Sequence, residues 1–144
     1  MNDLLKLENQ LCFPVYALSR EIISQYRPLL TELDLTYPQY LVLMVLWEHE
    51  VMSVNQIGDQ LHLDSGTLTP LLKRLEAKGL INRNRSTVDE RVVVIRLTDD
   101  GKKMEEQASC ITMQLVEKMD FSPEEFKVLK QMIQKLLVQY KSNK

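Results

Sequence analysis

Residues 53–98 read SVNQIGDQLHLDSGTLTPLLKRLEAKGLINRNRSTVDERVVVIRLT. Ser53 begins a capping box with Gln56, and Asp64 precedes a run in which leucines recur every three or four positions. These signals predict two short helices, separated by residues 61–63 alone. Two capped helices with such a tight joint are typical of a helix-turn-helix.

A β-hairpin is predicted directly after these helices. Gly79 fits the position that follows a helix C-terminus, and the pattern then changes to two strands, 80–85 and 91–97, the second of them β-branched. The polar residues 86–90 form the turn between them. A hairpin that follows a helix-turn-helix predicts a winged helix.

Longer helices are predicted on both sides of this region. Residues 4–33 have apolar side chains at helical spacing, and Pro14 and Pro28 are expected to bend or divide that helix. Pro14 either kinks it or leaves Cys12 near a helix N-terminus. Three more helices are predicted from N-cap residues, namely Thr36, Thr98 and Ser122.

The predicted fold is mainly α, with six helices and a small β-hairpin wing, in one domain of residues 1–144. The DNA-binding region would be residues 36–98, and residues 1–35 and 99–144 would hold the dimerisation helices. Both terminal helices carry apolar seams that a chain of 144 residues cannot easily bury alone. The seams predict a homodimer, although packing within one chain remains an alternative.

The charge distribution favours a local nucleic-acid surface over a general one. The net charge is -2, so the whole chain has no basic signature. Residues 64–96, however, contain seven basic and four acidic side chains, which gives this segment +3 and the remainder -5. Positive charge is therefore concentrated on the second helix of the pair and on the hairpin.

The DNA-binding candidates lie on this helix and hairpin. Since its leucines face the core, the helix should turn its polar side chains outward, where the hydroxyls approach bases and the basic groups contact phosphates. On the hairpin, Asp89 is close enough to hold the guanidinium of Arg91. Lys78 and Arg96 are expected to be solvated surface residues. The DNA-binding candidates are Ser65, Thr67, Thr69, Lys73, Arg74, Arg83, Arg85, Asp89 and Arg91.

The sequence disfavours a secreted protein, a membrane protein, a metal-binding protein and an enzyme. The N-terminus has no signal-peptide pattern and no apolar run reaches the ~20 residues of a membrane helix, so a cytoplasmic protein without a membrane partner is expected. Cys12 and Cys110 lie far apart without a histidine cluster, so no zinc site, other metal or cofactor is predicted, and His49 and His62 are taken as solvated or core-edge residues. A thiol peroxidase is disfavoured because Asn9, not Thr, lies three residues before Cys12. We therefore do not expect this protein to be an enzyme.

The chain resembles the MarR family over essentially its full length, and within it the organic-hydroperoxide regulators of the OhrR subgroup. The motifs that carry this resemblance are LENQLCF at 7–13, YRPLL at 26–30, TYPQYL at 36–41, DSGTLTPLL at 64–72, and the hairpin sequence DER at 89–91 followed by Val92, Val94, Leu97 and Thr98. The resemblance implies a dimeric repressor bound to an inverted repeat of double-stranded DNA, with recognition helices about 34 Å apart.

Cys12 is the candidate redox sensor. Tyr16 lies one helical turn away, where its hydroxyl can stabilise a thiolate. Tyr26 is on nearly the same face but about 21 Å along the helix, so it can meet Cys12 only across an antiparallel dimer. The resemblance implies that Tyr16, Tyr26 and Tyr37 surround the sensor thiol, and that its oxidation by an organic hydroperoxide or related oxidant releases DNA.

Three alternatives remain open. Cys110 is either a small buried apolar residue or, as the two-cysteine branch of the family implies, a resolving thiol for the partner's Cys12; otherwise a low-molecular-weight thiol caps the oxidised cysteine. The signal is either this oxidation or a small phenolic or aromatic ligand in the dimer cleft. A winged helix that binds only protein is the third alternative, which the basic hairpin disfavours.

Overall fold

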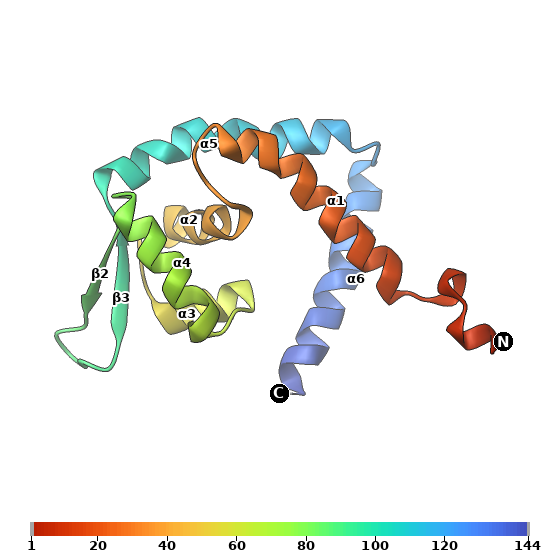
Figure 1. Ribbon diagram of the computed structural model, residues 1–144, viewed down its shortest axis with the longest axis horizontal. Helices are drawn as coiled ribbons and strands as arrows, with labels where there is room; N and C mark the ends of the chain where they lie inside the picture. Colours follow the sequence, from red (N-terminus) through yellow and green to blue (C-terminus); the bar gives the residue numbers. More distant parts are fainter. Residues whose placement is uncertain (1, 144) are drawn as a thin grey trace. The chain divides into compact units, whose positions relative to one another are not determined.

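The computed structural model describes residues 2–143, and its ribbon is shown in Figure 1. Within these residues the chain forms the predicted six α-helices and a small antiparallel sheet. The elements are α1 Cys12–Thr31, α2 Tyr37–His49, β1 Val51–Ser53, α3 Val54–Leu61, α4 Ser65–Ala77, β2 Ile81–Arg85, β3 Val93–Leu97, α5 Asp99–Lys118 and α6 Pro123–Ser142, with short 3-10 turns at Asp3–Leu5 and Leu7–Asn9. The chain divides into two compact units, one ending at Thr112 and the other beginning at Met113.

The helix starts are confirmed by side-chain hydrogen bonds. Thr36, Ser53 and Ser122 each complete a capping box with the residue three positions later. The Asp64 carboxylate accepts from the Thr67 N–H at 2.7 Å, and the Thr98 hydroxyl accepts from the Gly101 N–H at 3.0 Å. These contacts satisfy amide donors that have no acceptor within their own helix.

The sheet has one strand more than the sequence analysis predicted. Its order is β1-β3-β2, with β3 antiparallel to both neighbours, and Val51 lies opposite Arg96. The expectation of a two-stranded hairpin was therefore incomplete. β1 has three residues, too few to show an alternating pattern, and it forms because β3 offers it a free edge.

The core fixes the rotation of α4. Leu68, Leu72 and Leu75 are fully buried, in one apolar cluster with Leu43 of α2 and Ile57 of α3. Burial of each such side chain contributes about 1.5–3 kcal/mol. Because the leucines occupy one side of α4, its opposite side must face solvent.

The N-terminal segment differs from the expected long helix. α1 begins at Cys12, and residues 3–9 form two 3-10 turns instead of a continuous helix. Side chains there form hydrogen bonds with the backbone: the Asn2 side-chain oxygen accepts from the Leu4 N–H at 3.0 Å, and the Asn9 side-chain amide donates to the Asp3 carbonyl at 2.7 Å. Pro14 is the third residue of α1, where an N–H has no intrahelical acceptor, so it starts the helix and does not kink it.

Pro28 lies inside the last turns of α1, which continues to Thr31. It therefore does not divide the helix, contrary to one of the two outcomes expected for it. As a result, Cys12 and Tyr26 belong to one helix, as the sequence analysis assumed, with Cys12 as its first residue.

Candidate nucleic-acid interface and thiol site

The outward face of α4 carries the predicted polar residues. Ser65, Thr67, Lys73 and Arg74 are exposed, and Thr69 is half-buried with its hydroxyl donating to the Ser65 carbonyl at 2.7 Å. The predicted orientation is confirmed. Short hydroxyls at the start of the helix and basic groups further along it form a surface of the kind that enters a DNA groove.

The turn between β2 and β3 holds a fixed arginine. The Arg91 side chain is 90% exposed, and its Nε and Nη2 donate to the two Asp89 carboxylate oxygens at 3.1 and 3.2 Å. The expected contact between these two residues is therefore present. The hydrogen bonds from Arg91 hold the pKa of Asp89 below its ordinary value. A fork of this kind limits the directions in which the guanidinium can point.

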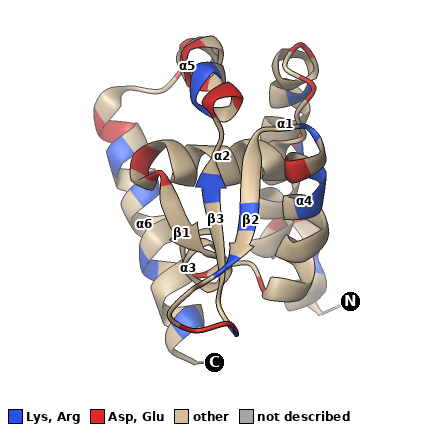
Figure 2. Ribbon diagram, turned by 90° about the vertical axis from the view of Figure 1, so that its left-hand side faces the viewer, with Lys and Arg blue, Asp and Glu red and all other residues tan. Residues whose placement is uncertain are grey.

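The other basic residues of this region divide into two groups. Arg85 and Arg96 are exposed on β2 and β3, and Figure 2 shows the basic positions along these strands and on α4. Arg83 is 21% exposed, and its backbone N–H donates to the Glu76 carboxylate at 3.0 Å while its guanidinium lies 4.0 Å from it. Arg83 thus fastens β2 to α4 and lies away from the tip of the wing.

Lys78 lies at the surface, as expected, but its ammonium group has acceptors within the protein. Its ammonium group donates to the backbone carbonyl of Asp34 and, at 3.2 Å, to the side-chain oxygen of Gln39. The Asp34 carboxylate lies 3.6 Å away, and the Lys78 side chain is only 30% exposed. No local pattern indicates this contact, because Asp34 precedes Lys78 by 44 residues.

Cys12 is an exposed thiol at the first position of α1, where the helix dipole favours negative charge. The expected contact with Tyr16 is not formed: within residues 2–143 no hydrogen bond joins the two side chains. Tyr16 is exposed, and the guanidinium of Arg20 lies 5.3 Å from its ring centroid.

Tyr26 and Tyr37 meet in an aromatic cluster, with ring centroids 4.8 Å apart. Tyr40 lies 5.9 Å from Tyr26, and Trp47 lies 6.1 Å from Tyr40. Burial, together with Tyr37 and Tyr40, raises the pKa of Tyr26 to about 12, and burial raises the pKa of Tyr37 as well. Both phenols, like any tyrosine, keep their protons near neutral pH and can donate hydrogen bonds, and burial extends this to higher pH.

Tyr40 and Trp47 were not predicted as members of this cluster. Both were taken only as part of an apolar run. Their spacing from Tyr37, three and ten residues, places all three on related faces of α2 and was the available signal.

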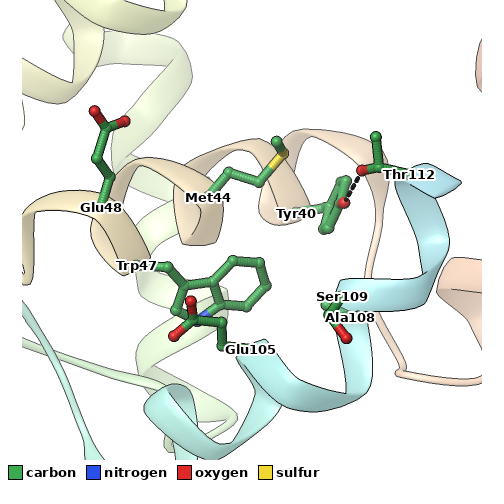
Figure 3. Close-up of a pocket in the computed structure, with 8 residues that line it drawn as sticks. All are labelled: Tyr40, Met44, Trp47, Glu48, Glu105, Ala108, Ser109 and Thr112. Carbon is green, nitrogen blue, oxygen red and sulfur yellow. Dashed lines mark hydrogen bonds between the residues drawn. The ribbon is translucent and has the colours of Figure 1, made fainter.

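A cavity of about 330 Å³ opens beside the aromatic cluster, between α2 and the first part of α5. Figure 3 shows its lining residues and the hydrogen bond of 3.0 Å between the Tyr40 and Thr112 hydroxyls. Trp47 forms part of one wall and donates from its indole nitrogen to the Gly101 carbonyl at 2.9 Å. The charged residues among those that line the cavity are Glu48 and Glu105.

Cys110 is exposed on α5, with its sulfur 3.9 Å from the Ser109 hydroxyl. The interpretation of Cys110 as a buried core residue is therefore wrong for the single chain. Ala108 and Ile111 occupy the buried face of α5 instead, one on each side of this exposed pair.

Large apolar side chains are exposed in both units. On α1 they include Leu11, Phe13, Val15 and Leu18. Helix α6 has no buried residue, and it exposes Phe126, Ile133, Leu136 and Tyr140 along one stripe. Apolar surfaces of this extent mark interaction sites in water. None of the helices in residues 2–143 combines the length and the apolar character required to cross a lipid bilayer.

The chain is similar to known regulators of transcription. Residues 24–108 match the family model described as transcriptional regulator SarA/Rot. The chain is 54% identical to the organic hydroperoxide resistance transcriptional regulator of Bacillus subtilis, over 94% of this chain and 92% of that protein.

Solved structures of AbfR, a protein of Staphylococcus epidermidis, are also similar. Reduced AbfR bound to DNA shares 36% identity with a TM-score of 0.81, covering 98% of this chain and 96% of that one. The disulfide form of AbfR shares 40% identity with a TM-score of 0.67, covering 91% and 92%.

The fold, the polar face of α4 and the basic wing define a winged-helix regulator of transcription that binds DNA. The chain belongs to the MarR family, in the group of the organic hydroperoxide resistance regulators, whose members sense redox change.

Proposed function

We propose that this protein is a homodimeric repressor that leaves an inverted-repeat operator when Cys12 is oxidised by an organic hydroperoxide. The observation that carries the proposal is an exposed thiol at the N-terminus of α1, in the same unit as a complete winged helix. The relatives support it, because one is named for resistance to organic hydroperoxides and another has been solved on DNA and in a disulfide form.

In this proposal α4 reads the major groove. Ser65, Thr67 and Thr69 approach base edges near the start of the helix, while Lys73 and Arg74 contact phosphates. Arg91, directed by Asp89, enters the minor groove beside it, and Arg85 contacts the backbone nearby. Arg83 supports the wing through Glu76. The whole chain acts as one MarR-type domain, in which residues 1–35 and 99–144 form the dimer interface.

The chemical step begins with the thiolate of Cys12. It attacks the distal oxygen of the hydroperoxide, the O–O bond breaks, and the alkoxide takes a proton and leaves as an alcohol. The product is a sulfenic acid. A second thiol then attacks its sulfur, forming a disulfide and releasing water.

The identity of the second thiol depends on Cys110. Its exposure makes it available as the resolving thiol for the partner's Cys12. If the dimer holds the two sulfurs too far apart for disulfide geometry, a low-molecular-weight thiol takes this place.

Tyr26 and Tyr37 contribute from the partner chain. Each can donate to the Cys12 sulfur across the dimer, and Tyr26 cannot do so within its own chain, because it lies about 21 Å from Cys12 along α1. Oxidation converts the sulfur from an acceptor of these bonds into a bulkier group, so the aromatic cluster must rearrange. Tyr16, whose ring lies against Arg20, would join this set only on dimerisation.

A regulator gated by a small phenolic ligand is the second candidate, and the cavity beside Tyr40 favours it. Its two glutamates argue against a phenolate or carboxylate, because they would repel an anion. An enzymatic role has no support from the family, whose members regulate transcription. As a regulator of chromosomal DNA, the protein would act in the bacterial cytoplasm.

The test compares operator binding by reduced protein before and after one equivalent of organic hydroperoxide. Wild-type protein should be released, whereas Cys12→Ser should stay bound. Cys110→Ser serves as the matched thiol variant, and loss of the covalent dimer on a non-reducing gel would identify Cys110 as the resolving thiol. If Cys12→Ser is released as readily as wild type, the redox mechanism is wrong and a ligand-gated regulator replaces it.

A further inference from the structure

The C-terminal end of α4 is held from two sides. On one side, Lys78 donates to the Asp34 carbonyl in the turn after α1 and to the Gln39 side chain in the first turn of α2. On the other side, the Thr98 hydroxyl, which caps α5, donates to the Gly79 carbonyl at 2.6 Å. Leu80 also contacts this region, since its carbonyl accepts from the Thr98 N–H. Residues 78–80 thus connect α4 to the start of α2 and to the start of α5, and we name these three residues the α4 junction.

The turn that Lys78 contacts also holds the sensor tyrosine. Gln39 is 3% exposed, and its side-chain oxygen accepts from the Thr36 N–H at 3.1 Å as well as from Lys78 at 3.2 Å. Tyr37 is the first residue of α2 and lies inside this capping box. Lys78 therefore holds the same four-residue turn of backbone in which Tyr37 is fixed.

The α5 side of the junction is equally close. The Thr98 N–H donates to the Leu80 carbonyl at 3.1 Å, and Gly101 approaches the same carbonyl so tightly that an added Cβ would lie 2.1 Å from its oxygen. The Gly101 carbonyl in turn accepts from the Trp47 indole. The helix that carries Cys110 thus begins in contact with the end of α4.

We infer that Lys78 is a positioning residue for the redox response: it transmits a change at Tyr37 to the recognition helix. This inference rests on the proposed function. The buried leucines hold the middle of α4 against the core, and the Lys78 ammonium, which donates to acceptors of residues 34 and 39, adds a polar link between the end of α4 and that turn. When the turn at residues 34–39 moves, Lys78 pulls the C-terminal end of α4 with it.

The coupling is measured as a ratio. Operator Kd is determined for reduced and for oxidised protein, and the quotient of the two reports how strongly oxidation acts on α4. For Lys78→Met we expect this ratio to fall about ten-fold, because a hydrogen bond to a charged group has been removed from the link. Thiol titration should show that Cys12 is still oxidised. Lys78→Arg retains a donor and should recover most of the ratio.

Lys103→Met is the matched control, since it removes one exposed lysine charge from α5. Its ratio should equal that of wild type. Lys78→Met should fold, because Gln39 keeps its bond from Thr36 and the Asp34 carbonyl can accept from water, and circular dichroism checks this.

The outcomes separate the two proposals. If Lys78→Met weakens both redox states equally and keeps the wild-type ratio, Lys78 contributes only charge and the inference is wrong, while the proposed function stands. If wild type itself is not released on oxidation, the proposed function fails and this inference fails with it.

Discussion

Replacement of Gly101 by alanine should destabilise the protein strongly. Its Cβ would lie 2.1 Å from the Leu80 carbonyl oxygen and 3.0 Å from Leu97 Cδ2, whereas ordinary carbon–oxygen contacts need about 3.3 Å. The first turn of α5 must therefore move by roughly 1 Å, at an overpacking cost of about 1–3 kcal/mol. The movement also weakens the hydrogen bonds Thr98–Leu80 and Trp47–Gly101, each contributing about 1 kcal/mol.

Set against a gain of about 1 kcal/mol in helix propensity, the net loss is about 3 kcal/mol. At about 3 °C per kcal/mol for a chain of this size, Tm should fall by about 10 °C. Thermal unfolding followed by circular dichroism measures this, with all proteins at one concentration because dimerisation affects Tm. Gly66→Ala is the matched control, since its Cβ would meet only an Asp64 carboxylate oxygen at 3.4 Å. A Gly101→Ala protein that melts within ~2 °C of wild type would contradict the packing described for the α4 junction.

Two further predictions concern the aromatic cluster and the wing. The pKa of Tyr26 is about 12 in the folded protein, against 10.0 for an ordinary tyrosine. The contribution of Tyr26 to the free energy of unfolding is therefore fully present below pH 10. It falls as the pH rises toward 12, because in this range the unfolded chain loses the Tyr26 proton and the folded chain keeps it. Urea unfolding at pH 9 and pH 11 should show a smaller loss for Tyr26→Phe than for wild type; an equal loss would place the titrating group elsewhere. Arg91→Ala should weaken operator binding about ten-fold and Asp89→Ala should weaken it less, in fluorescence anisotropy titrations. Unchanged affinity in Arg91→Ala would favour a winged helix that binds only protein.

Local chemistry explains why so much of the fold was predictable. A capping box needs two residues three positions apart, and both Ser53 and Ser122 show it in the printed sequence and form it in the structure. The leucine spacing of α4 likewise determines which side is buried, so the outward orientation of Lys73 and Arg74 followed directly. Signals of this kind need no knowledge of distant segments.

The errors arise where a partner is distant along the chain. β1 exists only as a neighbour of β3, and Val51 pairs with Arg96, 45 positions later in the sequence. Lys78 has its acceptors at the turn after α1, and no local pattern distinguishes it from a solvated lysine. The exposure of Cys110 is a different case, because Ala108, Ile111 and Leu115 stand at helical spacing and are buried, and Cys110 lies off that face; the signal was present in the sequence but was not applied to Cys110.

Under the proposed mechanism, the charge distribution would let a small movement of α4 release the DNA. Residues 64–96 carry +3 while the rest of the chain carries -5, so DNA is attracted to one face of the protein and repelled elsewhere. Each lost phosphate contact removes the free energy that counterion release contributes to DNA binding, and the acidic remainder of the chain cannot form a replacement contact with phosphate. In a dimer the two α4 faces must also match grooves one helical turn apart. If α4 is displaced through Lys78 as proposed, both requirements fail at once, and the operator would be lost although the recognition helix is neither unfolded nor covered.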